Sequence, residues 1–151
     1  MDGENIRTLT GDPIPYQAMW KEPERFSTSL IINNTITLVG QQAFRGWSNA
    51  TSLTIPNSVE IIHPQAFQYW YVLPNLVIPE SVTEIWEEAF ADANSLTSIT
   101  VLAQIPPDLK NVNAFSGSTV TKNFYVPAGS LNAYKTAQNW SAYASQIFAI
   151  P

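Results

Sequence analysis

The chain contains no cysteine, and this absence limits the chemistry that it can perform. Disulfide bridges, a thiol nucleophile and a zinc site built from cysteines are all excluded. The absence does not identify a cellular compartment, because a secreted protein can also lack cysteine.

Charged residues are scarce as well. They make up 13% of the 151 residues, about half of the quarter that is usual in globular domains. The net charge is −5, and the seven Lys and Arg residues are scattered from Arg7 to Lys135. The sequence therefore offers no basic patch for nucleic acid, and its polar surface must consist mainly of Thr, Ser, Asn and Gln.

Long apolar runs are also missing. No stretch approaches the roughly 18 apolar residues that a membrane span requires. The first ten residues, MDGENIRTLT, have neither the basic nor the apolar region of a secretion signal. The chain is therefore cytosolic, or has lost a signal, or is a piece of a longer protein, and the repeat pattern below favours the last two.

What the sequence does contain is enough apolar material for one core, with 45% hydrophobic and 12% aromatic residues. The dipeptide Ala-Phe recurs at 43–44, 66–67, 89–90 and 114–115, at steps of 23, 23 and 25 residues. Coils beginning at Ile32, Ile55 and Ile78 align without gaps. A fourth, from Val101 to Tyr125, has two additional residues in the Pro106-Pro107 loop. Such a period predicts a solenoid of stacked coils.

Each coil carries the same local pattern. The segment SLTSITV (95–101) predicts a strand, because its apolar residues can point inward and its polar residues outward, and β-branched residues suit such a strand. Pro56 and Pro79 end the equivalent strands, and SVTEI (81–85) predicts a second short extended piece. We expect a turn or a short 3₁₀ helix around Ala-Phe. The recurring phenylalanines are expected to fill the interior, namely Phe44, Phe67, Phe90 and Phe115.

The two ends depart from the repeat. Residues 1–31 are expected to form a degenerate first coil or the remnant of an upstream region, followed by repeats over 32–125. Residues 126–151 are expected to form a C-terminal cap of the same domain. Ser130 is the predicted N-cap of a helix over about 131–138. The cap residues expected to cover the last coil are Leu131, Tyr134, Ala137, Trp140, Tyr143, Ile147 and Phe148.

The phrase IPxSVxxIxxxAF, at 23-residue spacing over about residues 26–126, resembles the BspA-like leucine-rich repeat. The ending FYVPAGSLNAYKTAQNWSAYASQIFAI (124–150) is similar to the C-terminal ending common in that family. The chain departs from the family pattern at Asn33, Tyr69, Ala93 and Thr121.

The resemblance implies a leucine-rich-repeat solenoid of the α/β horseshoe class, built mostly of short β-strands. We expect about four coils of 23–25 residues and a C-terminal helical cap. It also implies a secreted or cell-surface protein that binds host matrix proteins, other cells or glycans, without enzymatic activity, cofactor or metal. The family has no shared catalytic residues to transfer to this chain.

Catalytic chemistry has little support in the residues themselves. His63, the single histidine, is expected on an exposed turn, without the neighbours that a nucleophilic triad needs. Glu84, Glu87, Glu88 and Asp92 are expected to form a solvated acidic edge. A calcium site and a glycosidase carboxylate pair are the alternatives for these acids.

Two groups of residues are candidates for binding. Trp47 and Trp70 share one column, Tyr69 and Tyr71 flank Trp70, and Trp86 stands in the next coil. These rings either complete the core or form a binding patch. The outward strand positions are a second candidate surface, with Lys122 as its single charge and with Thr54, Thr100 and Tyr125 as representative positions.

Three functional hypotheses follow from the sequence. The first is a non-enzymatic interaction module that adheres to a host or neighbouring-cell protein or glycan through repeat surfaces. The second is a structural spacer that presents another domain. The third and most remote is a carbohydrate-active enzyme that uses Glu84, Glu87 or Glu88. The sequence specifies neither the ligand, the organism, the anchoring mode nor the oligomeric state.

Overall fold

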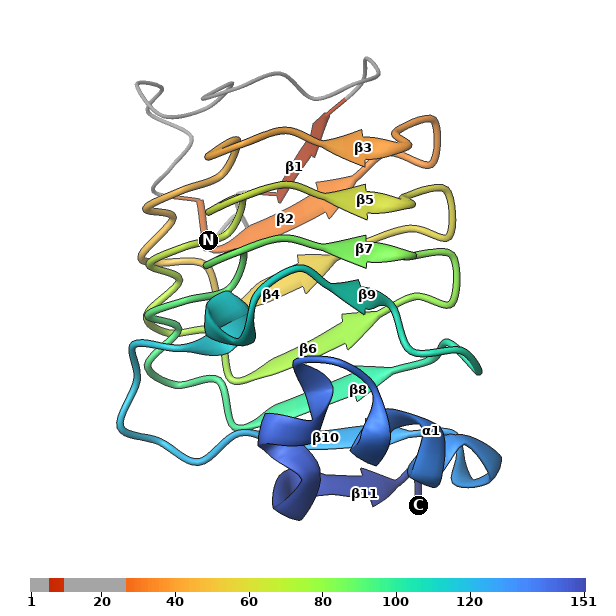
Figure 1. Cartoon of the computed structure of the whole chain (residues 1–151). Helices are drawn as coiled ribbons and strands as arrows, with labels where there is room; N and C mark the ends of the chain where they lie inside the picture. Colours follow the sequence, from red (N-terminus) through yellow and green to blue (C-terminus); the bar gives the residue numbers. More distant parts are fainter. Residues whose placement is uncertain (1–5, 10–26) are drawn as a thin grey trace.

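The computed structural model of the chain describes residues 6–9 and 27–151, and these form a stack of coils (Figure 1). The strands are short and lie on two faces of the stack. They are Ile6–Leu9 (β1), Ser29–Ile32 (β2), Leu38–Val39 (β3), Ser52–Thr54 (β4), Ile61–Ile62 (β5), Asn75–Ile78 (β6), Glu84–Ile85 (β7), Ser98–Val101 (β8), Asp108–Leu109 (β9), Asn123–Val126 (β10) and Ile147–Ala149 (β11). The helical pieces are Val112–Phe115 (η2), Ala128–Ser130 (η3), Leu131–Thr136 (α1) and Trp140–Gln146 (η4).

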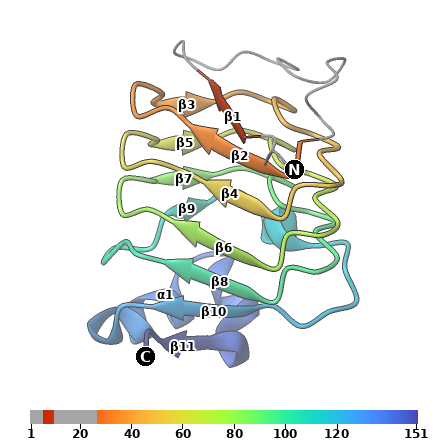
Figure 2. The ribbon, with the colours of Figure 1, turned by 180° about the vertical axis from the view of Figure 1, so that it is seen from behind.

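All strand pairs in the described residues are parallel, and each strand pairs with its counterpart one coil away. One side of the stack, which we call the sheet face, carries two sheets, β1-β2-β4 and β6-β8-β10-β11. Figure 2 shows this side from the front. The second sheet, β3-β5-β7-β9, lies on the opposite side of the stack. Leu30 is in register with Leu53, and Leu76 with Ile99. The 23-residue period predicted from sequence is therefore the register of the sheets.

A third side of the stack, which we call the turn side, consists of the Ala-Phe segments. They form turns in the first three coils and the 3₁₀ helix η2 in the fourth, which confirms the prediction. Backbone bonds join successive turns, from Phe44 N to Ala66 O at 2.9 Å and from Phe67 N to Ala89 O at 2.8 Å.

No described coil contains an α-helix, in agreement with the mostly short strands and the turns or short 3₁₀ helices that the sequence predicted. Gln42, Gln65 and Glu88 have φ angles of +56°, +58° and +56°, and residues in this left-handed region interrupt an α-helix.

The core contains one column of stacked rings. Phe44 and Phe67 lie 5.4 Å apart between ring centroids, Phe67 and Phe90 5.2 Å, and Phe90 and Phe115 5.4 Å. Their planes differ by 11° or less. All four side chains are buried, as the sequence predicted. Burial of each phenylalanine stabilises the fold by about 1.5–3 kcal/mol.

The C-terminal segment, residues 126–151, covers the last coil with side chains that donate hydrogen bonds. A following coil would have satisfied the exposed carbonyls of residues 103–112 with backbone N–H groups, and here side chains do so instead. The donors and acceptors are Ser130 Oγ to Gln104 O (2.7 Å), Tyr134 OH to Ala103 O (2.8 Å), Asn139 Nδ2 to Leu109 O (2.6 Å), Trp140 Nε1 to Pro107 O (2.8 Å) and Tyr143 OH to Val112 O.

Two predictions for this segment need correction. Ser130 is the N-cap residue of α1, as predicted, but its side chain bonds to Gln104 and not to the first turn of the helix. Phe148 was expected to cover the last coil, yet its side chain is 45% exposed. Its strand β11 pairs with β10, and alternation along that strand buries Ile147 and turns Phe148 outward. Tyr134, Trp140 and Ile147 are buried against the core as predicted.

Candidate binding surfaces

Trp47 and Trp70, two of the candidate binding residues, are fully buried. Their rings stack with centroids 5.9 Å apart and planes 5° from parallel, and each packs edge-on against the phenylalanine three residues before it. Trp70 Nε1 donates to the carbonyl of Phe44 at 2.8 Å. Both tryptophans are core residues, so in this structure neither side chain is available to a partner.

Tyr69 and Tyr71 lie at the surface beside Trp70, and Arg45 packs against them. The Arg45 guanidinium lies 4.9 Å from the centre of the Tyr69 ring, and the two tyrosine rings are 5.9 Å apart. Tyr71 is 41% exposed. Tyr69 has a φ of +70° in a column where two coils have Gly46 and Gly117, a conformation that costs a side-chain-bearing residue about 1–2 kcal/mol.

A ladder of polar side chains crosses the turn side of the stack, and sequence reasoning missed it. Gln42 Nε2 donates to Gln65 Oε1 at 2.5 Å, and Gln65 Nε2 donates to Glu88 Oε2 at 2.6 Å. Arg45 Nε donates to Gln68 Oε1 at 2.8 Å, and Gln68 Nε2 contacts Asp92 Oδ2 at 3.4 Å. The signal was the repeated polar residue just before or after Ala-Phe.

Trp86 lies on the second sheet, in the column that also holds His63 and Lys110. The His63 and Trp86 ring centroids are 5.5 Å apart, and Lys110 Nζ lies 5.5 Å from the centre of the Trp86 ring. Glu84 Oε2 accepts from Trp86 Nε1 at 3.1 Å. His63 was expected on an exposed turn, but its ring is only partly exposed, because it packs against Trp86.

The acids of this coil do not form one group. Glu84 belongs to the second sheet and lies 3.5 Å from Lys110 Nζ, whereas Glu88 and Asp92 accept from the glutamines of the turn side. Lys110 also contacts Asp108 at 2.5 Å, and this hydrogen bond, with smaller help from Glu84, raises the pKa of Lys110.

Thr54, Thr100 and Tyr125 lie on the sheet face, as predicted, in one outward column. The column runs across six strands and contains Ile31, Thr54, Val77, Thr100, Tyr125 and Phe148. Val77 is 50% exposed, and the Tyr125 and Phe148 rings are 6.1 Å apart. Ser98, Thr100, Tyr125 and Pro151 line a shallow hollow of about 300 Å³ at the end of this column.

Lys122, predicted as the single charge of the sheet face, is only 5% exposed. Burial lowers the pKa of Lys122, and the nearby Asp92 carboxylate opposes that shift. Lys122 lines a separate hollow of about 510 Å³ beside the loop 116–121. The outward strand positions from Ser29 to Phe148 therefore carry no charged side chain.

Within residues 6–9 and 27–151, no three His, Asp or Glu side chains are grouped so that they could hold a metal ion. None of the helices in the described part of the chain has the length and apolar character needed to cross a membrane.

Residues 24–139 match the BspA type leucine rich repeat region, in six copies. The match begins inside the predicted degenerate front and ends inside the predicted cap, and its six copies exceed the four coils that the sequence alignment gave. Repeats of this type are generally non-catalytic modules that bind macromolecules. No curated protein matches the chain. Because the match covers more than half of its residues, the chain belongs to the BspA-type leucine-rich repeat family.

Proposed function

We propose that this chain is an adhesion module of a secreted or surface-anchored protein, and that it binds a protein of a host or of a neighbouring cell through its sheet face. The observation that carries this proposal is the uncharged outward column, in which Val77 and Phe148 are exposed and the partly exposed Tyr125 ring lies beside Phe148. A flat strip of this kind suits a protein partner better than a glycan, because it offers few polar groups for sugar hydroxyls.

The composition of the sheet face supports this proposal. The centres of protein interfaces are depleted in charged residues, and aromatic residues supply much of their binding energy. Tyr125 and Phe148 form an aromatic pair at one end of the column. Thr54 and Thr100 add β-branched side chains that are already held by the strands, so their ordering on binding costs little entropy.

The size of the sheet face predicts a weak single contact. Six strands of three or four residues, about 4.8 Å apart, cover at most roughly 24 Å by 13 Å, or about 300 Å². A standard protein interface buries about 800 Å² on each partner. We therefore expect strong adhesion only where several copies of the module engage one surface together, because linked contacts multiply their affinities.

Charge insertion tests the proposal. The double variant T54K/T100K places two ammonium groups in the uncharged column without removing a buried contact, since Thr54 is exposed and Thr100 partly exposed. Its affinity for a matrix protein found in a binding screen with the complete chain should fall about tenfold or more, because each lysine must lose water at the interface. The control Q41K adds one lysine at an exposed turn position and should bind normally.

Loss of binding in Q41K alone, or unchanged binding in T54K/T100K, would contradict the sheet-face assignment. A screen that gives glycans but no proteins as partners would contradict the choice of a protein.

A structural spacer is the second candidate function, and the bonds between coils favour it. Backbone hydrogen bonds join successive coils along the second sheet and the turn side, and along the sheet face except between β4 and β6, which makes the stack a stiff rod. If the module is only a spacer, replacing it with an unrelated rigid segment of equal length should preserve the adhesion of the protein that carries it. Loss of adhesion after that replacement would exclude the spacer.

A further inference from the structure

One corner of the fourth coil differs from the same corner in the earlier coils. In the first three coils the chain leaves the sheet face through a tight turn, closed by bonds from Ile36 N to Asn33 O, Val59 N to Pro56 O and Val82 N to Pro79 O. The two additional residues of the fourth coil fall in the corresponding segment, 102–107. This segment is longer and has no such turn bond.

The longer corner separates the fourth coil from the third over a few residues. Bonds between the two coils stop after Leu102 N to Ile78 O, at 3.0 Å, and resume at Asp108 N to Thr83 O, at 2.8 Å. On its other side the corner is held by the C-terminal segment, through the hydrogen bonds of Tyr134, Ser130 and Trp140 to its carbonyls. These hydrogen bonds hold segment 102–107 away from the third coil and keep the gap between the two coils open.

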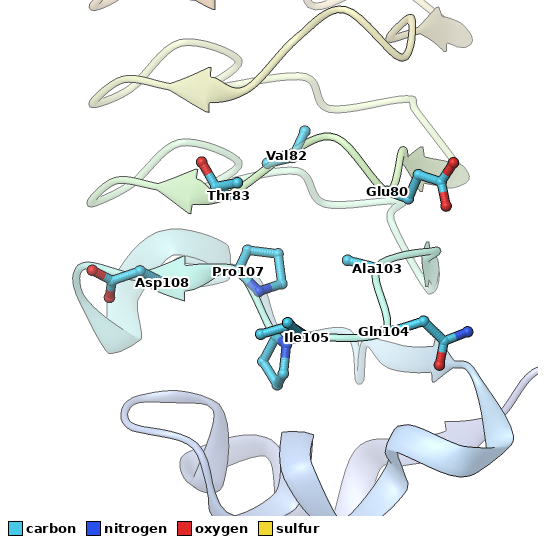
Figure 3. A pocket seen from close by; sticks show the side chains of 9 residues that line it. Glu80, Val82, Thr83, Ala103, Gln104, Ile105, Pro107 and Asp108 are labelled. Carbon is cyan, nitrogen blue, oxygen red and sulfur yellow. The ribbon is translucent and has the colours of Figure 1, made fainter.

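A hollow lies between the two coils at this point. Its volume of about 540 Å³ is within the range of about 300–1,000 Å³ that is usual for ligand pockets. Figure 3 shows Glu80 and Asp108 at opposite ends of the hollow, with apolar side chains between them. Ile105 is 82% exposed, so an aliphatic surface faces solvent at the rim. The lining residues are Glu80, Val82, Thr83, Ala103, Gln104, Ile105, Pro106, Pro107 and Asp108.

The charges around the hollow favour a cation. Glu80 makes no ion pair with any residue that the structure describes, and no basic residue lines the hollow. Asp108 pairs with Lys110, which also contacts Glu84. These three carboxylates and one ammonium leave a net formal charge of −2 beside an apolar surface.

We propose that this hollow receives a lysine or arginine side chain of the partner protein. The aliphatic stem of such a side chain would lie over Ile105 and Pro107, and its charged head would pair with Glu80. This inference rests on the proposal that the chain binds a protein, and it adds a site at the corner beside the sheet face. The sequence signal for this site was the insertion at Pro106-Pro107, which widens the corner.

Titration of the complete chain with N-acetylarginine amide tests this site, with the neutral isostere N-acetylcitrulline amide as the matched probe. The amide signals of Thr83, Gln104 and Ile105 should shift in NMR spectra, and the arginine probe should bind about fivefold more tightly than citrulline, since one exposed ion pair contributes up to a factor of about five. Equal binding of the two probes, or no shift at these residues, would overturn the proposal.

Matched variants locate the ion pair. E80Q should weaken binding of the arginine probe about fivefold, whereas E60Q, which removes an exposed carboxylate outside the hollow, should leave it unchanged. I105Q should weaken both probes, because it removes the aliphatic rim. Equal effects of E80Q and E60Q would overturn the assignment.

The variant T54K/T100K separates this inference from the proposed function. It should bind the arginine probe as the unmodified chain does, since its substitutions lie on the sheet face. Suppose that T54K/T100K binds a matrix protein normally, whereas E80Q binds neither the arginine probe nor the matrix protein. The proposed site in the hollow is then supported, and the sheet-face assignment fails. If E80Q loses neither ligand, the hollow assignment fails, whatever the sheet face does.

Discussion

At the residue scale, the contribution of each side chain to the stability of the fold depends on the residues that it contacts in the neighbouring coil. Gly46, Tyr69, Asp92 and Gly117 form one column in which every residue has a positive φ, yet their surroundings differ. Trp47 and Trp70 form another column in which the rings are equivalent but the hydrogen bonds are not. Such pairs allow one substitution to serve as the control for the other.

The two tryptophans give the first prediction. Trp70 Nε1 donates to Phe44 O, whereas Trp47 Nε1 has no acceptor among the residues that the structure describes. W70F should therefore lower the free energy of unfolding by about 1–3 kcal/mol more than W47F, because it leaves a buried carbonyl without a donor. Urea denaturation of both variants measures the difference. An equal loss in the two variants would show that the hydrogen bond contributes nothing.

The two glycines of the positive-φ column give the second prediction. A Cβ at Gly117 would lie 2.1 Å from Asp92 Oδ1, whereas a Cβ at Gly46 meets nothing within 4 Å. G46A should cost about 1–2 kcal/mol through backbone strain alone. G117A should cost more, because Asp92 must also move away. Thermal unfolding that finds G46A at least as destabilised as G117A would contradict this account.

At the element scale, the strands and turns followed from the sequence more completely than the C-terminal segment did. Alternation of apolar and polar residues fixes which side of a strand is buried, so the sheet-face column could be predicted from SLTSITV and its equivalents. The donors that close the last coil could not, because Asn139 and Trp140 meet acceptors 30 and 33 residues away. Ser130 resembled a helix cap in sequence, but a distant carbonyl competes for its hydroxyl.

The burial of Trp47 and Trp70 shows a second limit of sequence reasoning. Aromatic rings in one column suit both a stacked core and a surface patch, and only the orientation of the turn after Phe44 and Phe67 distinguishes them. The same holds for the hollow at the fourth corner. The insertion was visible, but its opening depends on side chains from the C-terminal segment.

The C-terminal segment gives the third prediction. Burial raises the pKa of Tyr134, so the folded state keeps this proton at a pH where the unfolded chain, with a tyrosine pKa near 10, loses it. The stabilisation is complete below about pH 10 and falls as the pH rises above it. Burial raises the pKa of Tyr143 in the same direction.

Y134F removes the largest contribution of this kind. It should be less stable than the unmodified chain at pH 8, by about 1 kcal/mol for the bond to Ala103 O, and should lose less stability between pH 9 and 11. Urea denaturation across this pH range measures both effects. Parallel losses in the two proteins would contradict the role of Tyr134.

At the scale of the whole molecule, the coils provide a stiff scaffold whose two strand-bearing faces have different chemistry. The second sheet bears the charged and aromatic column of His63, Trp86 and Lys110, whereas the sheet face bears no charge. The repeat alone explains the stacked core, and function must depend on the residues that vary between coils on these surfaces. We propose that the sheet face mediates adhesion and that the hollow at the corner beside it binds a cationic side chain.

The most direct test of this account maps the contact with an adhesion partner by methyl NMR. The methyl groups of Val77 and Thr100 report on the sheet face, and those of Leu38 and Ile61 report on the second sheet of the same molecule. On addition of the partner, the signals of Val77 and Thr100 should shift and broaden while those of Leu38 and Ile61 stay in place. Shifts confined to Leu38 and Ile61 would contradict the assignment of adhesion to the sheet face.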